Sequence, residues 1–257
     1  MVVQGGLFSR ANSSASQAFS RRMISVVIPC FNEKENIERF PQTLFPALRE
    51  LNEDLEIIAV DDGSSDGSGD VLKKFEDSKE LKLLSHRQNR GMGAALKSGF
   101  SEAAGDWILV LDADLTFSPK DVRLLIENQR KNSSDLVSGA PRLILDGLSQ
   151  VPFLRRFLRR SANFLYQLAL GIPFSSFTSI FRLYRSSLLK RLEIQSDGFE
   201  INAEILAFFW AQGFKVSEAP VSLSSRKSGR SKLNLRREAA AHLRLIFRLM
   251  KLVRMNQ

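Results

Sequence analysis

The chain has 257 residues and a formal net charge of +9, and its 44% hydrophobic and 25% charged residues are typical of a folded globular protein. The positive excess is confined to residues 226–257, which hold ten Lys and Arg and one acidic residue, so residues 1–225 carry no net charge. A neutral body with a basic end disfavours a protein coated for nucleic acid along its length, and we expect no nucleic-acid partner.

Simple counts exclude several kinds of site. The single cysteine, Cys30, excludes an intrachain disulfide and a cysteine-rich zinc site, and the two histidines exclude a multi-histidine metal centre. No run of about 18 apolar residues is present, so we predict no transmembrane helix. Residues 1–22 lack the long apolar region of a secretory signal, and we expect a disordered leader there. An organelle transit peptide and a start at Met23 remain open alternatives.

From Met23 onward, short apolar runs alternate with helical stretches, which is typical of an α/β protein with a mostly parallel sheet flanked by helices. Strands are predicted over residues 24–29, 55–60, 81–84, 107–111, 136–139, 177–184 and 214–223. Helices are predicted from residue 32, over 70–77, within 91–104, from 118 to about 131, over 153–168 and over 198–212. We expect Asn32 to cap the first helix with Glu35 as its partner, and Ser118 with Pro119 to start the fourth.

An acidic pair follows the strand predicted over residues 107–111. Asp112 and Asp114 are two residues apart, and carboxylates so spaced in an extended segment point the same way. Such a pair can hold a hard divalent cation, Mg²⁺ or Mn²⁺, which in turn can bridge a diphosphate. A solvated turn is the alternative.

A second acidic segment, DDGSSD, follows the strand predicted over residues 55–60. Asp62 is placed to accept hydrogen bonds from a nucleobase or a ribose, and Gly63 permits close approach of the backbone. For Asp66 and Ser68, a turn with a helix cap is an equally good interpretation.

Two further loops carry phosphate-binding residue types. The segment RGMG, residues 90–93, is consistent with a phosphate-binding loop or simply with the start of a helix. The segment RKSGRSK, residues 226–232, places several cations around a glycine and could close over a diphosphate, with Arg as a fork and Lys as a point charge. A solvated basic loop is the alternative for the second segment.

Five segments occur along the chain in this order: SVVIPCFNEKENI, VDDGSSDGS, RGMGAALKSGF, GDWILVLDADLTFSP and RKSGRSKLN. Together they resemble family 2 glycosyltransferases of the GT-A fold, in the branch of dolichol-phosphate mannosyltransferases and polyprenyl-phosphate glycosyltransferases. The resemblance implies a Rossmann-like GT-A domain over residues 23–235. It also implies inverting transfer of a hexose, mannose or glucose, from a nucleoside-diphosphate sugar such as GDP-mannose or UDP-glucose to dolichyl or undecaprenyl phosphate.

The resemblance also implies residue roles. Nucleotide-sugar contacts are implied for Pro29, Phe31, Glu33, Val60, Asp62, Asp112, Ala113 and Arg226. Metal binding falls to Asp112 and Asp114, which together with Arg142, Arg226 and Lys232 form the implied catalytic set. Arg142, Arg182 and Lys232 are the candidates for the lipid phosphate. The chain departs from the family pattern at Thr116, where Gln is common, and at Ser176, where an acidic residue is usual.

The nature of the acceptor decides whether a base is required. A phosphate monoester has a second pKa of about 6 and is already largely ionised at neutral pH, so it needs no strong general base. An acceptor hydroxyl would need one. Transfer to a hydroxyl of a soluble or cell-envelope glycan is the alternative function.

The basic end is amphipathic. Six cations fall within one arc of about 120° on a helix, namely Arg236, Arg237, Arg244, Arg248, Lys251 and Arg254. Apolar residues fill most of the remaining surface, a pattern typical of a helix lying in a membrane interface, and we predict such a helix over residues 236–257. Packing against its own domain or against a separate membrane subunit is the alternative. We expect a peripheral protein on the inner, cytoplasmic face of the membrane.

Overall fold

The computed structural model describes residues 22–141, 163–222 and 235–255, with backbone only for 235–237 and 251–255. The predicted leader over residues 1–22 therefore lies outside the described residues except for Arg22. The strands are β1 (Ile24–Cys30), β2 (Leu55–Asp61), β3 (Lys82–Ser85), β4 (Trp107–Val110), β5 (Leu136–Pro141), β6 (Arg182–Arg185) and β7 (Val216–Val221). The α-helices are α1 (Lys34–Ile37), α2 (Leu44–Arg49), α3 (Ser68–Asp77), α4 (Met92–Glu102), α5 (Val122–Asn132), α7 (Ser186–Leu189), α8 (Ile201–Ala211) and α9 (Leu235–Met255). Two short 3₁₀ helices are η1 (Phe40–Gln42) and η2 (Pro119–Asp121), and residues 163–170 are also helical.

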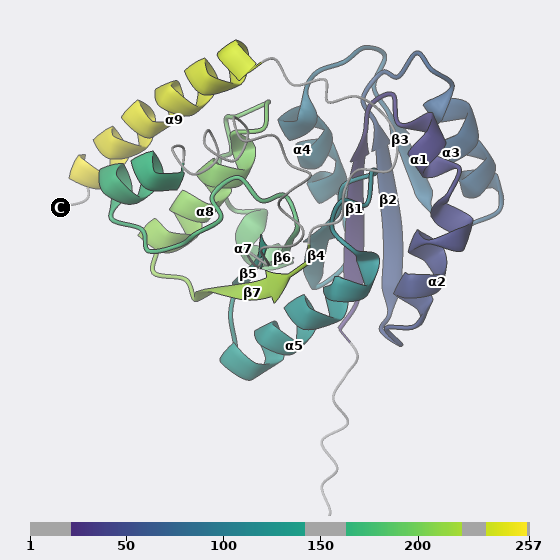
Figure 1. Cartoon of the computed structure of the whole chain (residues 1–257), viewed down its shortest axis with the longest axis horizontal. Helices are drawn as coiled ribbons and strands as arrows, with labels where there is room; N and C mark the ends of the chain where they lie inside the picture. Colours follow the sequence, from purple (N-terminus) through teal and green to yellow (C-terminus); the bar gives the residue numbers. More distant parts are fainter. Residues whose placement is uncertain (1–21, 142–162, 223–234, 256–257) are drawn as a thin grey trace, which may run out of the picture.

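These strands form one seven-stranded sheet in the order β3-β2-β1-β4-β6-β5-β7 (Figure 1). Strand β6 runs antiparallel to β4 and β5, and the other pairings are parallel. Strands β1 and β4 are buried at almost every position, as expected for parallel strands with both faces covered. The predicted mostly parallel sheet with flanking helices is confirmed.

Helix α4 packs closely on the sheet. Helix α4 lies on β1 and β2, and a Cβ atom at Gly99 would clash with the side chain of Val27. Glycine at this position therefore lets the helix approach the strand. Helix α5 packs on β5 and β7, and it follows η2, where the Ser118 hydroxyl accepts a 3.3 Å hydrogen bond from Lys120 N and Pro119 comes first. The cap predicted at Ser118 is confirmed.

Two local predictions are wrong. Helix α1 begins at Lys34 without a side-chain cap, and Asn32 lies before it with a φ of 52°. The Asn32 side-chain oxygen instead accepts a 2.7 Å hydrogen bond from Ser65 N, so it ties the loop after β1 to the loop after β2. The strand predicted over 177–184 is much shorter, because only β6, beginning at Arg182, pairs with its neighbours.

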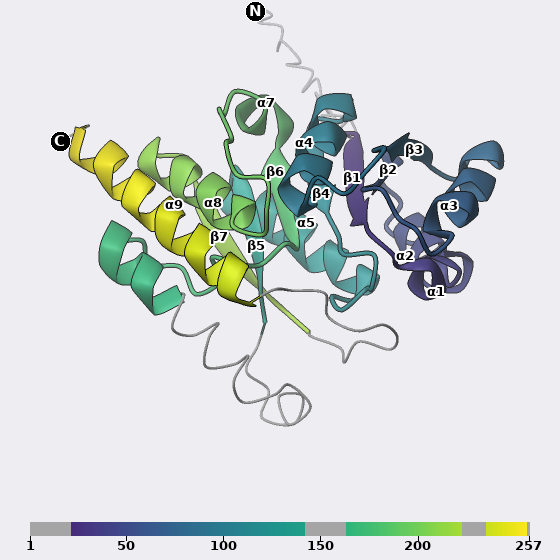
Figure 2. The same cartoon turned by 90° about the horizontal axis from the view of Figure 1, so that it is seen from above.

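Helix α9 packs along the domain instead of standing apart from it. Leu245, Ile246 and Leu249 join the hydrophobic core, and Figure 2 shows α9 beside α8 and the helical residues 163–170. The Tyr166 hydroxyl lies 2.8 Å from His242 Nδ1, which links these two segments directly. Within the ranges that the structure describes, no helix is both long and apolar enough to cross a membrane.

Candidate active site

Parallel pairing brings the ends of β1, β2 and β4 to one edge of the sheet. Cys30 pairs with Asp61, and Val27 pairs with Val110. Residues that follow these strands therefore leave the sheet at the same edge, which is where ligands bind in open parallel sheets. Phe31, Asp62 and Asp112 are among them.

The acidic pair after β4 lies in a tight turn. Asp112 and Asp114 are half-buried, whereas Ala113 between them is buried. Leu115 has a φ of 50° and donates a 3.1 Å backbone hydrogen bond to the Asp112 carbonyl. Thr116 donates twice to Asp114 Oδ1, from its backbone N at 2.9 Å and from its hydroxyl at 2.7 Å. One carboxylate oxygen of Asp114 is thus held in place by the residue that replaces the usual Gln.

The chemistry of this pair fits a hard cation that shares its ligands with a phosphate. Mg²⁺ is typically bound through one or two carboxylates plus substrate phosphates, and Asp112 and Asp114 supply two carboxylates. Among the described residues, this site included, no group of three or more His, Cys, Asp or Glu is arranged to hold a metal. A diphosphate and water are the kinds of ligand that would complete the shell of such a cation.

Asp62 is the centre of a hydrogen-bond cluster after β2. Its side chain is buried, and it accepts hydrogen bonds from Arg90 N at 2.9 Å and Gly91 N at 2.8 Å. His86 Nδ1 lies 2.6 Å from Asp62 Oδ1. His86 lies outside the five ordered segments of the sequence and was not among the predicted site residues. Its position directly after β3 was the available signal, because that strand ends at the same edge of the sheet.

The glycines of residues 90–93 have a packing role. Gly93 N donates a 2.7 Å hydrogen bond to the Asp197 carbonyl, and a Cβ atom at Gly91 would clash with that same carbonyl. Gly91 also has a φ of 99° and directly precedes α4. Because these backbone N–H groups bond within the protein, the geometry favours the helix-start interpretation over a phosphate loop.

The other residues considered for nucleotide contact differ in their solvent exposure. Pro29, Phe31 and Glu33 are half-buried at the open edge of the sheet. Val60 is fully buried, so its side chain belongs to the core and only its backbone could approach a ligand. Asp66 accepts hydrogen bonds from the Ser68 hydroxyl and from two backbone N–H groups. Desolvation alone would raise the pKa of Asp66, but these hydrogen bonds outweigh it and lower the pKa, as expected for the turn interpretation.

Cys30, at the end of β1, contributes no reactive thiolate to this edge. Burial raises the pKa of its thiol well above the ordinary value, with Asp61 and Glu33 adding to the shift. The thiol lies 3.5 Å from the Ile28 carbonyl. It therefore behaves as a small buried side chain.

Arg182 occupies an environment unlike the one implied for a phosphate ligand. The side chain is fully buried, and its guanidinium donates to Ser138 Oγ at 3.1 Å and to the carbonyls of Ser176, Phe177 and Asn202. All its nitrogens are engaged in supporting the chain around β6, so we remove it from the lipid-phosphate candidates. Arg142, Arg226 and Lys232 lie outside the described residues.

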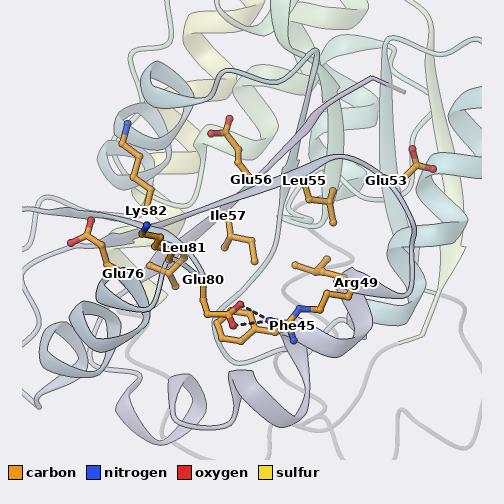
Figure 3. Close-up of a pocket in the computed structure, with 12 residues that line it drawn as sticks. Phe45, Arg49, Glu53, Leu55, Glu56, Ile57, Glu76, Glu80, Leu81 and Lys82 are labelled. Carbon is orange, nitrogen blue, oxygen red and sulfur yellow. Dashed lines mark hydrogen bonds and ion pairs between the residues drawn. The ribbon is translucent and has the colours of Figure 1, made fainter. Parts of the chain in front are cut away.

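A cavity of about 620 Å³ lies at the opposite end of β2 (Figure 3). It is lined by apolar side chains, including Phe45 and Ile57, and by charged ones. The Arg49 guanidinium and the Glu80 carboxylate at this cavity form an ion pair at 2.7 Å. None of the candidate site residues that the structure describes lines this cavity.

Two curated relatives align with most of this chain. It is 32% identical over 234 residues to a dolichol-phosphate mannosyltransferase of Pyrococcus furiosus, covering 89% of this chain and 64% of the relative. It is 30% identical to an undecaprenyl-phosphate 4-deoxy-4-formamido-L-arabinose transferase of Pseudomonas fluorescens, covering 81% of this chain and 59% of the relative. The chain thus spans less than two thirds of the length of these relatives.

Solved structures match the fold at lower identity. A mannosyltransferase of Pyrobaculum calidifontis in complex with GDP-Man and Mn²⁺ superposes with a TM-score of 0.64 at 20% identity, over 92% of this chain and 65% of that one. Glucosyl-3-phosphoglycerate synthase of Mycobacterium tuberculosis with Mn²⁺, UDP-glucose and phosphoglyceric acid gives 0.67 at 19% identity, over 90% and 80%. The fold is therefore the GT-A fold. The profile of the family "Glycosyl transferase family 2" matches residues 25–193, and the chain belongs to that family.

Proposed function

We propose that the protein transfers a hexose, mannose or glucose, from a nucleoside-diphosphate sugar to a polyprenyl phosphate, with inversion at the anomeric carbon. The observation that carries this proposal is the Asp112–Asp114 pair, half-buried at the sheet edge that also holds Asp62. The relatives named above, whose names include dolichol phosphate and undecaprenyl phosphate, support the lipid acceptor.

The donor is bound across the ends of β1, β2 and β4. Asp62 accepts hydrogen bonds from the nucleoside, while Phe31 and Glu33 flank it from the loop after β1. Asp112 and Asp114 hold Mg²⁺ or Mn²⁺, which when bound supplies charge neutralisation at the diphosphate that leaves. Thr116 keeps Asp114 in a fixed orientation through its two hydrogen bonds.

The acceptor phosphate attacks without a strong base, because a phosphate monoester is already largely ionised at neutral pH. Repulsion between two anionic substrates is the remaining obstacle. Arg142 and the loop at residues 226–232, with Arg226 and Lys232, stay our candidates for offsetting it. If the loop acts at the departing diphosphate, Arg226→Ala and Lys232→Ala slow transfer more than they weaken nucleotide binding, and unchanged turnover in both variants contradicts this role.

A membrane surface is the proposed source of the acceptor. Exposed apolar side chains are present on α9 and on the neighbouring helical residues 163–170, namely Leu243, Phe247, Phe164, Leu165 and Leu168. Arg244, next to Leu243 in the sequence, is also exposed. Apolar insertion together with cations suits an anionic lipid surface, and we place the protein at the inner, cytoplasmic face. A separate membrane subunit covering the same side chains is the competing outcome.

The test is a panel of sugar nucleotides, including GDP-mannose and UDP-glucose, assayed with a short polyprenyl phosphate and with soluble glycans. We expect a sugar-phosphate lipid as product, formed only with a divalent cation. Transfer to a glycan hydroxyl, with none to the lipid phosphate, would instead establish the alternative function. Retention on anionic liposomes but not on RNA is expected, and retention by a membrane protein alone would replace the lipid surface by a subunit.

A further inference from the structure

Three side chains form a continuous hydrogen-bond chain from α4 to the edge of the sheet. Ser98 Oγ lies 2.9 Å from His86 Nε2, and His86 Nδ1 lies 2.6 Å from Asp62 Oδ1. The side chains of His86 and Asp62 are only 8% and 3% exposed. The His86 backbone N also donates to the Asp61 carbonyl at 2.9 Å, so the histidine is fixed at both its backbone and its ring.

The order Ser–His–Asp is that of a hydrolase triad, but the surroundings of Ser98 do not support hydrolysis. An acyl-transfer site needs backbone N–H groups aimed at the developing oxyanion. Ser98 lies well inside α4, where backbone N–H groups bond to carbonyls four residues earlier and are not available for this purpose. The chain of contacts therefore points toward Asp62 and not toward a reaction at Ser98.

The contacts of Asp62 are unequal between its two oxygens. Oδ1 contacts both His86 Nδ1 and the N–H of Arg90, whereas among the described residues the contact at Oδ2 is the N–H of Gly91. A carboxylate has about four lone-pair sites, so Oδ2 keeps capacity for a further donor. His86 and Arg90 N together occupy Oδ1, which leaves Oδ2 as the oxygen with fewer described donors.

We propose that His86 is a positioning residue for recognition of the donor nucleoside, with Ser98 as its anchor on α4. This proposal rests on the proposed function, because it assigns Asp62 Oδ2 to an N–H or O–H donor of the nucleoside. Helix α4 carries this anchor on a closely packed element, since Gly99, the next residue, lies against Val27 of β1 with no room for a Cβ atom. His86 itself touches neither the diphosphate nor the transferred sugar in this arrangement.

Three variants test the Ser98–His86 and His86–Asp62 contacts separately. His86→Ala removes both ring contacts, Ser98→Ala removes only the anchor, and His86→Asn keeps an amide N–H near the position of Nδ1. Ser101→Ala is the matched control, because Ser101 is exposed on the next turn of the same helix. The measurements are dissociation constants for GDP and UDP, with Mn²⁺ present, and for inorganic pyrophosphate, which lacks the nucleoside.

For the nucleotide that the wild type binds, we expect His86→Ala to raise the dissociation constant about tenfold, the effect of losing one hydrogen bond to a charged group. Ser98→Ala should have a smaller effect, His86→Asn should recover most of the loss, and pyrophosphate binding should not change. With sugar nucleotide as substrate, the KM should rise in His86→Ala while kcat falls far less.

Equal loss of pyrophosphate and nucleotide binding, or nucleotide binding by His86→Ala at the wild-type level, would overturn the positioning role. A His86→Asn variant no better than His86→Ala would also count against it. If His86→Ala does not fold, Ser98→Ala compared with Ser101→Ala decides the question. A wild-type protein that binds neither GDP nor UDP would instead contradict the proposed function itself.

Discussion

The acidic pair after β4 and the buried charges around β6 and α8 lie in contrasting environments. In the parallel half, Asp112 and Asp114 follow β4 and remain half-buried at an open edge. In the half built from β5, β6 and β7, Arg182 and Glu204 are fully buried. Glu204 accepts a 2.8 Å hydrogen bond from Ser196 N and pairs with Arg248 of α9 at 2.6 Å. A buried charged residue in a motif therefore stays a ligand candidate only where it keeps hydrogen-bonding capacity. Asp62 is 2% exposed but has a single described donor at Oδ2, whereas every nitrogen of Arg182 is engaged within the protein.

The largest effect should come from neutralising the acidic pair of the open edge. Asp112→Asn or Asp114→Asn should reduce turnover by about 10³-fold or more, because an amide removes charge from the place where the cation and the diphosphate meet. The melting temperature should stay near that of the wild type, since neither carboxylate belongs to the core. Sugar transfer is measured at saturating Mg²⁺ or Mn²⁺.

Asp106→Asn is the matched control, because Asp106 is exposed just before the other end of β4. It should leave both turnover and stability unchanged. Near-normal turnover by the Asp112 and Asp114 variants would mean that the acidic pair is only a solvated turn.

Substitutions of the buried charges should lower the free energy of unfolding and not primarily turnover. Arg182→Ala leaves the oxygen of Ser138 and the carbonyls of Ser176, Phe177 and Asn202 without their donor, and it opens a cavity. We expect the free energy of unfolding to fall by about 3 kcal/mol, measured by chemical denaturation. Arg182→Lys should recover little, because a lysine cannot reproduce the planar fork. A variant that is stable but deficient in lipid-phosphate binding would restore the role that the family resemblance implied.

The same contrast explains what could be predicted from the sequence. The alternation of apolar runs and helices was sufficient for the parallel sheet, and two carboxylates at a strand end were sufficient for the acidic pair. Burial of Arg182 could not be predicted, because it depends on carbonyls of residues 176, 177 and 202 that only the fold brings together. His86 was missed for a similar reason, since its partners Asp62 and Ser98 are 24 and 12 residues away.

Helix α9 has one face buried in the core and another exposed. One substitution on each face tests their different roles. Leu249 is 3% exposed and packs in the core, whereas Phe247 is 62% exposed. Leu249→Ala should lower the free energy of unfolding by about 2 to 4 kcal/mol. Phe247→Ala should leave stability nearly unchanged but weaken binding to anionic liposomes, measured by co-sedimentation.

Arg248 and Arg244 are two cations of α9 in different environments. Arg248 was predicted to belong to the basic arc of a helix lying in a membrane interface, yet its side chain forms an ion pair with the buried Glu204. Arg248→Ala should therefore cost stability more than liposome binding, whereas Arg244→Ala, at an exposed position, should do the reverse. Equal loss of liposome binding in both variants would show that the whole basic arc faces the membrane.

The smallest effect is expected from Thr116, which holds one carboxylate oxygen of Asp114 in place. Thr116 donates twice to Asp114 Oδ1, and Thr116→Val keeps the backbone hydrogen bond while removing the one from the hydroxyl. Loss of a group that orients a metal ligand typically weakens metal binding by tenfold or more, and because the backbone bond remains we expect a weakening of about tenfold at most. The midpoint of Mn²⁺ activation should shift upward accordingly, while turnover at saturating Mn²⁺ recovers. Thr116→Ser, which keeps the hydroxyl, should behave like the wild type. An unchanged midpoint in Thr116→Val would mean that the backbone N–H alone positions Asp114, and a loss that saturating Mn²⁺ cannot restore would mean that the hydroxyl contacts the substrate instead of supporting the carboxylate.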